Sequence, residues 1–451
     1  MHKRYLKCGP TGVGTMYSAI ASVWALLLGM ALIMLGNGLQ GTLLGVRATL
    51  EGFHTTVTGF VMTGYFAGFL VGSVLAPKIV ERVGHIRVFA ALASLASASV
   101  LVHAVFVDPL SWGAMRLVTG FSYAGLYVVA ESWLNDRATN ETRGQILSIY
   151  MVVAYGGMTV GQLLLNVASP GGFTLFVLIS VLVSLALVPI SLTAAPAPAF
   201  DAPMRVGLRQ LYRISPLGVL GGFGTGVANG MMFGMGAVYA RVAGMSVREV
   251  SLFMGLILLG GMLLQWPVGR VSDLFDRRKV IVAVTMLATA LGLLLALVPG
   301  ISTHGKLGLA FLLGGMVLPM YSLYGAHLND HLDPSQMVAA NSGYVLINGL
   351  GASLGPVAVS LAMAAVGPAG FFMALSAVLG AVVLFAVWRM TRRASVPPGD
   401  RGHFVGMPPR TSPIASALNP EAPPDAADWE DLPADAEEPA GAINRRAPRQ
   451  V

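Results

Sequence analysis

Residues 269–279 read GRVSDLFDRRK, a short charged stretch that separates two long apolar ones, 248–269 and 280–299. A helix that crosses a bilayer needs about 20 mostly apolar residues, because about 30 Å of hydrocarbon must be spanned at about 1.5 Å per residue. Both flanking stretches meet that length. The stretch 269–279 therefore predicts a tight turn between two membrane-spanning helices.

The same alternation of long apolar stretches and short polar gaps continues along most of the chain. Helices satisfy their own backbone hydrogen bonds in lipid, so short gaps are enough to join them. The first stretch is too long for a cleavable signal peptide. The sequence predicts twelve spans: 17–46, 56–78, 87–107, 110–134, 144–168, 172–192, 216–240, 248–269, 280–299, 307–328, 336–363 and 368–389.

The composition excludes an ordinary water-soluble protein. Of the 451 residues, 55% are apolar and only 11% are charged, whereas soluble domains have about 25% charged residues. The basic excess lies in the gaps, so the net charge of +7 reflects membrane topology and argues against nucleic-acid binding. No phosphate-binding loop, metal-ligand spacing or nucleophilic triad is visible. We expect no enzyme activity, cofactor or metal.

Lysine and arginine are distributed unequally between the two sides of the membrane. If the N-terminus is cytoplasmic, the gaps on that side hold 18 of them, and the opposite side holds four, Arg47, Arg241, Arg248 and Lys306. Cytoplasmic loops are enriched in these residues. The distribution predicts that both termini are cytoplasmic.

Two regions lie outside the predicted spans. Residues 193–215 predict a cytoplasmic linker between a bundle of six helices at 1–192 and a second at 216–393. Residues 394–451 are rich in proline and acidic residues, a composition that cannot bury a core. We expect a disordered cytoplasmic tail there, without an activity of its own.

The two halves of the chain resemble one another. A shift of 194 residues aligns Leu134-Asn135-Asp136 with Leu328-Asn329-Asp330 and gives eight identities in 35 positions. Six spans, a linker and six further spans are typical of transporters built from two parallel repeats, with the binding site between them.

The stretch 269–279 resembles the signature loop of the major facilitator superfamily, Gly-x-x-x-Asp followed by a basic cluster. The family carries this loop between spans two and three and often again between eight and nine. The first copy is degenerate here, with Pro77 in place of Gly and Glu81 in place of Asp. Residues 36–41, 130–136 and 155–162 look closest to the YcaD-like bacterial branch of the family. The resemblance implies an all-α protein of the bacterial inner membrane, with twelve transmembrane helices in two pseudo-symmetric bundles.

The resemblance also implies a gating role for the two loops. A carboxylate is attracted to the positive N-terminal end of a helix. Glu81 is therefore expected near Gln336, at the start of span eleven, and Asp273 near Arg143, at the start of span five. Alternatively, these charges only anchor the topology. The basic residues of the two gating loops are Arg82, Arg87, Arg277 and Arg278.

Two strongly ionisable side chains, Arg116 and Glu131, fall inside predicted spans. A charge there costs at least about 2.5–3.5 kcal/mol, so it usually faces the protein interior. The two are too far apart to touch, but they share a stripe of span four with Tyr123 and Tyr127, which we expect to line a cavity. Arg116 resembles the span-four arginine of proton-coupled family members, and Glu131 is the better candidate to take up a proton. The competing interpretation is that Glu131 snorkels to the nearby interface.

Other polar side chains in the spans are candidates for the same cavity. His327 in span ten, one turn after Tyr324, is expected to pair with Glu131, although a packing role is the alternative. Asn37, Gln40 and Asn229 are candidates to bind the substrate, because spans one and seven usually line the cavity in this superfamily. They can equally tie helices together.

The sequence thus predicts a secondary active transporter of a small organic solute that works by alternating access. Without a nucleotide site, uphill transport must draw on an ion gradient, most simply protons through Glu131 and Arg116. Efflux is the expected direction, and proton-coupled uptake of a small metabolite is the alternative. A third possibility is a membrane sensor or scaffold that acts through its tail. The expected partners are a neutral or weakly charged small-molecule substrate, protons and the bilayer, with no nucleic acid, and the expected state is a monomer.

Overall fold

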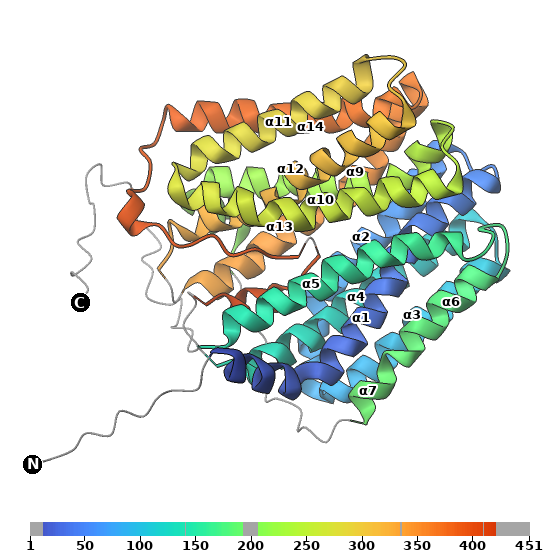
Figure 1. Cartoon of the computed structure of the whole chain (residues 1–451), viewed down its shortest axis with the longest axis horizontal. Helices are drawn as coiled ribbons and strands as arrows, with labels where there is room; N and C mark the ends of the chain where they lie inside the picture. Colours follow the sequence, from blue (N-terminus) through green and yellow to red (C-terminus); the bar gives the residue numbers. More distant parts are fainter. Residues whose placement is uncertain (1–11, 140, 193–205, 334–335, 409, 421–451) are drawn as a thin grey trace, which may run out of the picture.

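The structure, a computed structural model of the chain, describes residues 12–139, 141–192, 206–333, 336–408 and 410–420, and their side chains from Val23 onward except that of Pro398. The described residues form helices and no strand, which confirms the predicted all-α fold. The long helices run side by side along one axis, and α1 begins at the end of the bundle where α14 ends (Figure 1).

The helices follow the predicted spans closely. The first half holds α1 (Gly12–Leu50), α2 (Thr55–Val83), α3 (His85–Val105), α4 (Pro109–Arg137), α5 (Arg143–Leu163), η1 (Leu164–Asn166), α6 (Thr174–Leu185) and α7 (Leu187–Ser191). The second half holds α8 (Leu208–Ile214), α9 (Pro216–Val242), α10 (Val247–Leu274), α11 (Arg277–Leu297), α12 (Thr303–Asn329), α13 (Met337–Val366), α14 (Ala369–Met390), η3 (Pro398–Asp400) and η4 (Pro413–Leu418).

Local sequence sets where several helices begin. Asp108 caps α4 by accepting a hydrogen bond from the Ser111 amide at 2.9 Å, and Pro109 follows as the first helical residue. Ser215 and Pro216 repeat this arrangement at the start of α9. At α10, Ser246 and Glu249 form a reciprocal capping box. These side chains satisfy backbone amides that have no partner within the helix.

Ten helical segments in the described part of the chain are long and apolar enough to cross a membrane by themselves. These ten include α6 and α7 as one segment and do not include α4 and α9. With α4 and α9 added, the number is the predicted twelve. Both are longer than 25 residues, but α4 carries Arg116 and Glu131, and α9 is rich in glycine. Nearly all of α9 is buried among other helices, so neither helix needs a fully apolar surface.

The packing pairs of the first half recur in the second. Helix α1 packs on α5 as α9 packs on α13, and α2 packs on α4 as α10 packs on α12. Between the halves, α2 packs on α13 and, in the equivalent place, α5 packs on α10. This pairing is the twofold pseudo-symmetry expected from the 194-residue repeat, and it leaves the interface between the halves at the centre of the molecule.

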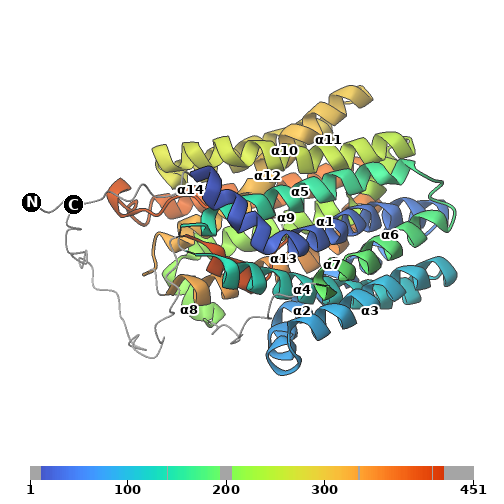
Figure 2. The same cartoon turned by 60° about the horizontal axis from the view of Figure 1, so that its bottom comes forward.

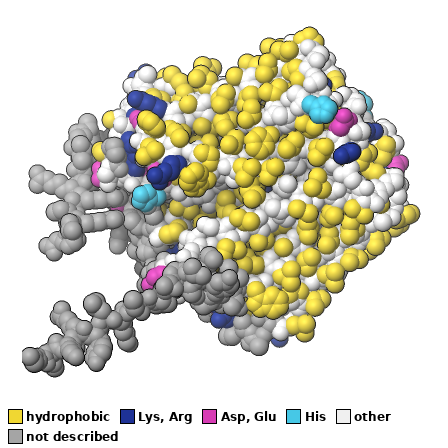
Figure 3. Space-filling view, viewed as in Figure 1, with side chains coloured by type: hydrophobic (Ala, Val, Ile, Leu, Met, Phe, Trp, Pro, Cys, Tyr) yellow, Lys and Arg dark blue, Asp and Glu magenta, His cyan; other side chains and the backbone are white. Residues whose placement is uncertain are grey.

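The surface divides into an apolar middle and charged ends. Hydrophobic side chains cover the middle of the face in Figure 3, while Lys, Arg, Asp, Glu and His lie toward the two ends. An apolar band with charged residues at both ends is the surface expected of a helical bundle that spans a membrane. We call the end at which α2 ends and α3 begins the basic end, which the lysine and arginine distribution predicts to be cytoplasmic.

Glycines let α2 and α4 approach closely. A Cβ added at Gly120 would meet the carbonyl oxygen of Tyr65, and one at Gly68 would meet that of Leu117. Gly113 also lies in α4, but an added Cβ there would have no atom within 4 Å. Small residues at such positions allow backbones to touch in a membrane bundle.

We therefore expect Gly120→Ala to destabilise the protein by about 1–3 kcal/mol, because α2 and α4 must move apart. Gly113→Ala is the matched control, since it brings the same gain in helix propensity without the contact. Thermal unfolding in detergent compares the two variants. Equal melting temperatures would show that the α2–α4 contact adapts without loss.

The predicted linker and the predicted tail are only partly described by the structure, and the described part of the tail differs from the prediction. Residues 193–205 of the expected linker lie outside the described residues, and the remainder contains α8. The tail was expected to be disordered from residue 394, but residues 411–419 are mostly buried. Here we call residues 402–420 the cavity segment; all but residue 409 are described. Residues 421–451 lie outside the described residues.

The cavity segment turns back after α14 and runs between the two halves (Figure 1). Its η4 turn contacts α4 and α5 of the first half and α13 of the second. Seen from the second direction, the same red segment lies among the helices near α13, at the basic end (Figure 2). The reason for the difference is local: residues 413–418 read PIASAL, an apolar stretch inside an otherwise polar tail.

Candidate functional site

The candidate site lies at the interface between the two halves. Helices α1, α2, α4 and α5 face it from one side, and α9, α10, α12 and α13 from the other, through the α1–α9, α2–α13 and α5–α10 contacts. These helices bring together polar side chains that are far apart in the sequence.

Glu131 is fully buried at this interface. Its carboxylate accepts a hydrogen bond from the Tyr150 hydroxyl at 2.9 Å, and another from the backbone amide of Ser412 at 2.9 Å. The Ser412 hydroxyl donates a third. Glu131 therefore does not snorkel: it is enclosed by α5 and the cavity segment.

Arg116 lies on the same helix as Glu131 but at a different depth. Its guanidinium is buried and stacks on the ring of Tyr65 at 4.5 Å from the ring centre. Such a stack favours a cation through the negative face of the ring. Arg116 thus faces the protein interior, as we expected from its sequence position, and its contact is an aromatic residue of α2.

Asn37 connects three helices at this depth. Its amide donates to the Tyr127 hydroxyl at 2.8 Å and to the Tyr65 hydroxyl at 3.2 Å. Its carbonyl oxygen accepts a hydrogen bond from the Arg410 guanidinium at 3.0 Å. The ring of Tyr123 packs near those of Tyr65 and Tyr127, with centres 6.2 and 6.4 Å away.

Gln40 and Asn229 are buried amides without a hydrogen-bond partner among the described residues. A buried amide that lacks a partner is unfavourable by about 1–3 kcal/mol, so it usually has a ligand or a water. Asn229 lines a cavity of about 560 Å³ between α2, α9, α12 and α13. Its walls are largely aromatic, and they comprise Tyr65, Phe66, Phe69, Phe233 and Tyr321, with Arg410 and Thr411 of the cavity segment.

His327 and Tyr324 lie elsewhere than expected. The Tyr324 hydroxyl is 3.3 Å from the Thr285 hydroxyl, inside the second bundle. The His327 ring packs on that of His331 with 4.9 Å between centres, so the expected pairing with Glu131 is not formed. The physical reason is that this part of α12 faces α9 and α11 of its own bundle: Tyr324 packs against Gly221, and His327 lies beside Leu217.

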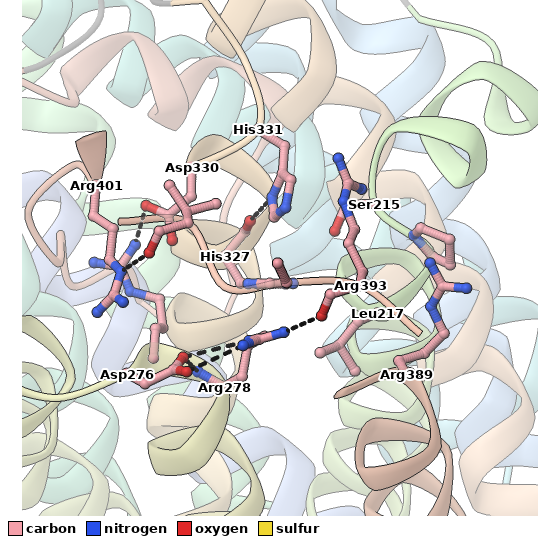
Figure 4. A pocket seen from close by; sticks show the side chains of 14 residues that line it. Ser215, Leu217, Asp276, Arg278, His327, Asp330, His331, Arg389, Arg393 and Arg401 are labelled. Carbon is pink, nitrogen blue, oxygen red and sulfur yellow. Dashed lines mark hydrogen bonds and ion pairs between the residues drawn. The ribbon is translucent and has the colours of Figure 1, made fainter. Parts of the chain in front are cut away.

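His327 instead lines a strongly basic pocket at the basic end (Figure 4). Arg278 bonds Asp276 at 3.1 Å and the carbonyl oxygen of Arg393 at 2.7 Å. Burial, with a smaller contribution from Arg393, lowers the pKa of His331 to about 4. The imidazole of His331 is therefore neutral at pH 7. The remaining charged residues that line this pocket are Arg277, Asp330, Arg389 and Arg401.

The gating contacts differ from those that the resemblance implied. Asp273 accepts a hydrogen bond from the Phe404 amide at 2.8 Å and pairs with Arg277 at 3.2 Å, rather than meeting the start of α5 near Arg143. The cavity segment occupies the space beside the end of α10, which explains the change of partner. Glu81 is exposed at the end of α2, and no bond from it is found among the described residues. Arg82 and Arg87, the basic residues predicted for this first gating loop, are also exposed.

Arg277 is the best-connected charge of the second loop. It is buried and pairs with Asp330, also buried, at 2.5 Å. It further donates to the hydroxyl of Ser272 at 3.1 Å and to the carbonyl oxygens of Ala326 at 3.1 Å and Gly402 at 2.7 Å. Arg277 thus ties together α10, α12 and the cavity segment.

Asp330 predicts a dependence of stability on pH. Burial raises its pKa to about 6, from 3.8 in an exposed aspartate, although Arg277 opposes this effect. Because the folded state then holds the proton more tightly than the unfolded chain, the contribution of Asp330 to stability falls as the pH rises from about 4 to about 6, and is constant above that.

Thermal unfolding of the native chain and of Asp330→Asn between pH 4.5 and 8 measures this contribution, since asparagine does not titrate. We expect the native chain to lose stability relative to the variant up to about pH 6. A relative gain over that range would mean that the ion pair with Arg277 outweighs burial.

Several residues of the site were not singled out in the sequence. Tyr65 and Phe233 look like ordinary interior residues of apolar helices. Asp330 carried a signal, because it belongs to the Leu-Asn-Asp motif that both halves share. Arg410 and Ser412 lie in a segment whose composition predicted disorder. In the described part of the chain, no group of three His, Cys, Asp or Glu side chains has the geometry of a metal site.

Comparison with known proteins identifies relatives over most of the chain. The family model of the Major Facilitator Superfamily matches residues 26–264 and 218–432. An uncharacterized MFS-type transporter, YcaD of Escherichia fergusonii, is 27% identical over 344 residues, which cover 76% of this chain and 88% of that protein.

Solved structures share the fold at low sequence identity. The nucleoside transporter NupG superposes with a TM-score of 0.68 at 13% identity, covering 82% of this chain and 98% of that one. The fucose:proton symporter FucP of E. coli superposes with a TM-score of 0.53 at 17% identity, covering 82% and 99%. These findings agree with the resemblance carried by residues 269–279.

Proposed function

The chain belongs to the major facilitator superfamily, and we propose that it moves a small organic solute through the cavity between its two bundles by alternating access. The family consists of multi-pass membrane transporters, and the relatives named above are transporters. The observation that carries the proposal is the polar interface between the halves, in which Glu131, Asn37 and Asn229 are all buried.

Coupling to protons is proposed to run through Glu131. A carboxylate enclosed by protein can exchange a proton when a conformational change exposes it, and its protonation changes which state is favoured. Its hydrogen bonds to Tyr150 and Ser412 come from different elements, so movement of either element alters its surroundings. Arg116 contributes a positive charge to the same helix.

Alternating access requires the contacts between the halves to break and reform. The Tyr155 hydroxyl on α5 donates to Gln265 on α10 at 2.9 Å, and Asn166 after α5 donates to Ser251 on α10 at 2.7 Å. At the α2–α13 contact, the Thr63 hydroxyl donates to the Ser353 carbonyl oxygen at 3.2 Å, and Gly59 lies close to Ser360. Such an interface can slide.

We propose that transport is export in exchange for protons across the bacterial inner membrane, with the basic end in the cytoplasm. The distribution of lysine and arginine supports this orientation. Proton-coupled uptake uses the same residues in the opposite direction, so it remains the alternative.

The test is transport by the purified full chain in liposomes, with the basic end outward, an acidic lumen and a panel of labelled solutes. Export by proton exchange accumulates solute in the lumen, whereas symport empties it. Either outcome supports secondary transport and decides its direction. Absence of solute movement under every imposed gradient would overturn the proposal and favour a sensor or scaffold.

A further inference from the structure

The cavity segment is held in the interface by its backbone as well as by its side chains. The Phe404 amide donates to Asp273, and the Met407 amide donates to the Ser322 hydroxyl at 2.9 Å. The Met407 carbonyl oxygen accepts a hydrogen bond from the Gln265 amide at 3.2 Å. The segment is thus bound as an extended peptide along α10 and α12.

Arg410 enters the aromatic cavity of the candidate site. Its guanidinium lies 5.1 Å from the ring centre of Tyr65 in the first half and 4.9 Å from that of Phe233 in the second. It also donates to the Asn37 carbonyl oxygen at 3.0 Å and to the Tyr65 hydroxyl at 3.3 Å. Aromatic faces with neutral oxygen acceptors form a recognition site for an organic cation.

The residues after Arg410 complete the contact with the site. The amide and hydroxyl of Ser412 both donate to Glu131. Residues 413–418 of η4 then bury their apolar side chains beside α4 and α13. The segment therefore contacts the proposed coupling residue and the aromatic cavity at the same time.

We infer that the cavity segment is a tethered ligand of the transport site, and that the solute which it displaces carries a guanidinium-like organic cation. This inference rests on the proposed function, because it names the class of solute for that site. The segment bridges both halves through Asn37, Tyr65, Phe233 and Ser322, so the halves cannot rock apart while it is bound. Transport requires the segment to leave. A solute that binds where the Arg410 guanidinium lies, between Tyr65, Phe233 and Asn37, competes with the segment; we call this place the Arg410 seat.

The charges around the seat favour a delocalised cation over an ammonium. Glu131 is the buried carboxylate of this interface, but its hydrogen bonds go to Tyr150 and Ser412. Arg116 stacks on Tyr65 as well, and it repels Arg410. A seat of this kind suits a planar, weakly hydrated guanidinium, which gains from aromatic contact more than from a point charge. The repulsion also keeps the tethered ligand displaceable.

The experiment compares the full chain with its variant Arg410→Gln, and uses benzylguanidinium as the probe and benzylurea as its neutral analogue. A tether keeps its ligand at high effective concentration. Removal of the Arg410 guanidinium should therefore raise the affinity of the protein for benzylguanidinium by about tenfold or more. Benzylurea should bind more weakly than benzylguanidinium to the variant. Arg392→Gln removes the same charge at the exposed end of α14 and should bind the probe like the native chain.

A second measurement reports on the segment itself. Ala415→Cys, at a buried position, is made in a Cys8→Ser background. Its thiol is expected to react with a thiol reagent faster when Arg410→Gln is added, or when benzylguanidinium is present. Ser412→Ala should act in the same direction through Glu131.

Unchanged affinity in Arg410→Gln, or equal binding of benzylguanidinium and benzylurea, would overturn the inference. These outcomes are separate from failure of the proposed function. Binding without movement of the probe across liposomes rejects transport and leaves the site intact. Transport of neutral solutes alone, with no binding of the cation, rejects the tethered-cation inference and leaves transport intact.

Discussion

Glu131→Gln is expected to abolish the accumulation of solute that a pH gradient drives, while exchange of solute across the membrane continues. Glutamine keeps the size of the side chain and can still bond Tyr150 and Ser412, but it cannot carry a proton between the two sides. A gradient of one pH unit supports about a tenfold accumulation for each coupled proton. We expect this ratio to fall to about one in the variant.

The measurement uses proteoliposomes and should be made both in the native chain and with Arg410→Gln, in which we expect the cavity to be free. Glu249→Gln is the control, because Glu249 lies in a capping box at the opposite end and glutamine also serves in that motif. If Glu131→Gln still accumulates solute against its gradient, the coupling proton does not pass through Glu131.

Arg277→Ala is expected to have the largest effect on stability. The variant leaves the buried carboxylate of Asp330 without its ion-pair partner, and loss of one member of a buried pair costs about 3–5 kcal/mol. It also frees the carbonyl oxygens of Ala326 and Gly402. The apparent melting temperature in detergent should fall accordingly, and less so below pH 6, where Asp330 takes up a proton.

Two further variants separate the ion pair from a general effect of charge. Arg278→Ala removes a neighbouring guanidinium whose partners are Asp276 and Arg393, and it should have a smaller effect. Adding Asp330→Asn to Arg277→Ala should restore part of the lost stability, because no unpaired charge then remains. A double variant less stable than Arg277→Ala alone would contradict a dominant role for the pair.

The site was only partly predictable. Arg116, Glu131, Asn37 and Asn229 were recognisable because polar groups inside a membrane are unfavourable and usually face the interior. The partners of these residues were not recognisable. Asp273 meets Phe404 and Arg277 rather than α5, and His327 meets His331 rather than Glu131, since helix rotation and the position of the cavity segment decide these contacts.

The all-α fold, the approximate limits of the spans and the similarity of the two halves follow from the amino-acid sequence alone. Those properties depend on the length of each apolar stretch and on the 194-residue repeat, both of which are features of the sequence. The return of residues 402–408 and 410–420 to the interface between the halves could be seen only in the three-dimensional structure. Ser412 and Glu131 are 281 residues apart, and a contact over that distance depends on a cavity which exists only after both bundles have packed.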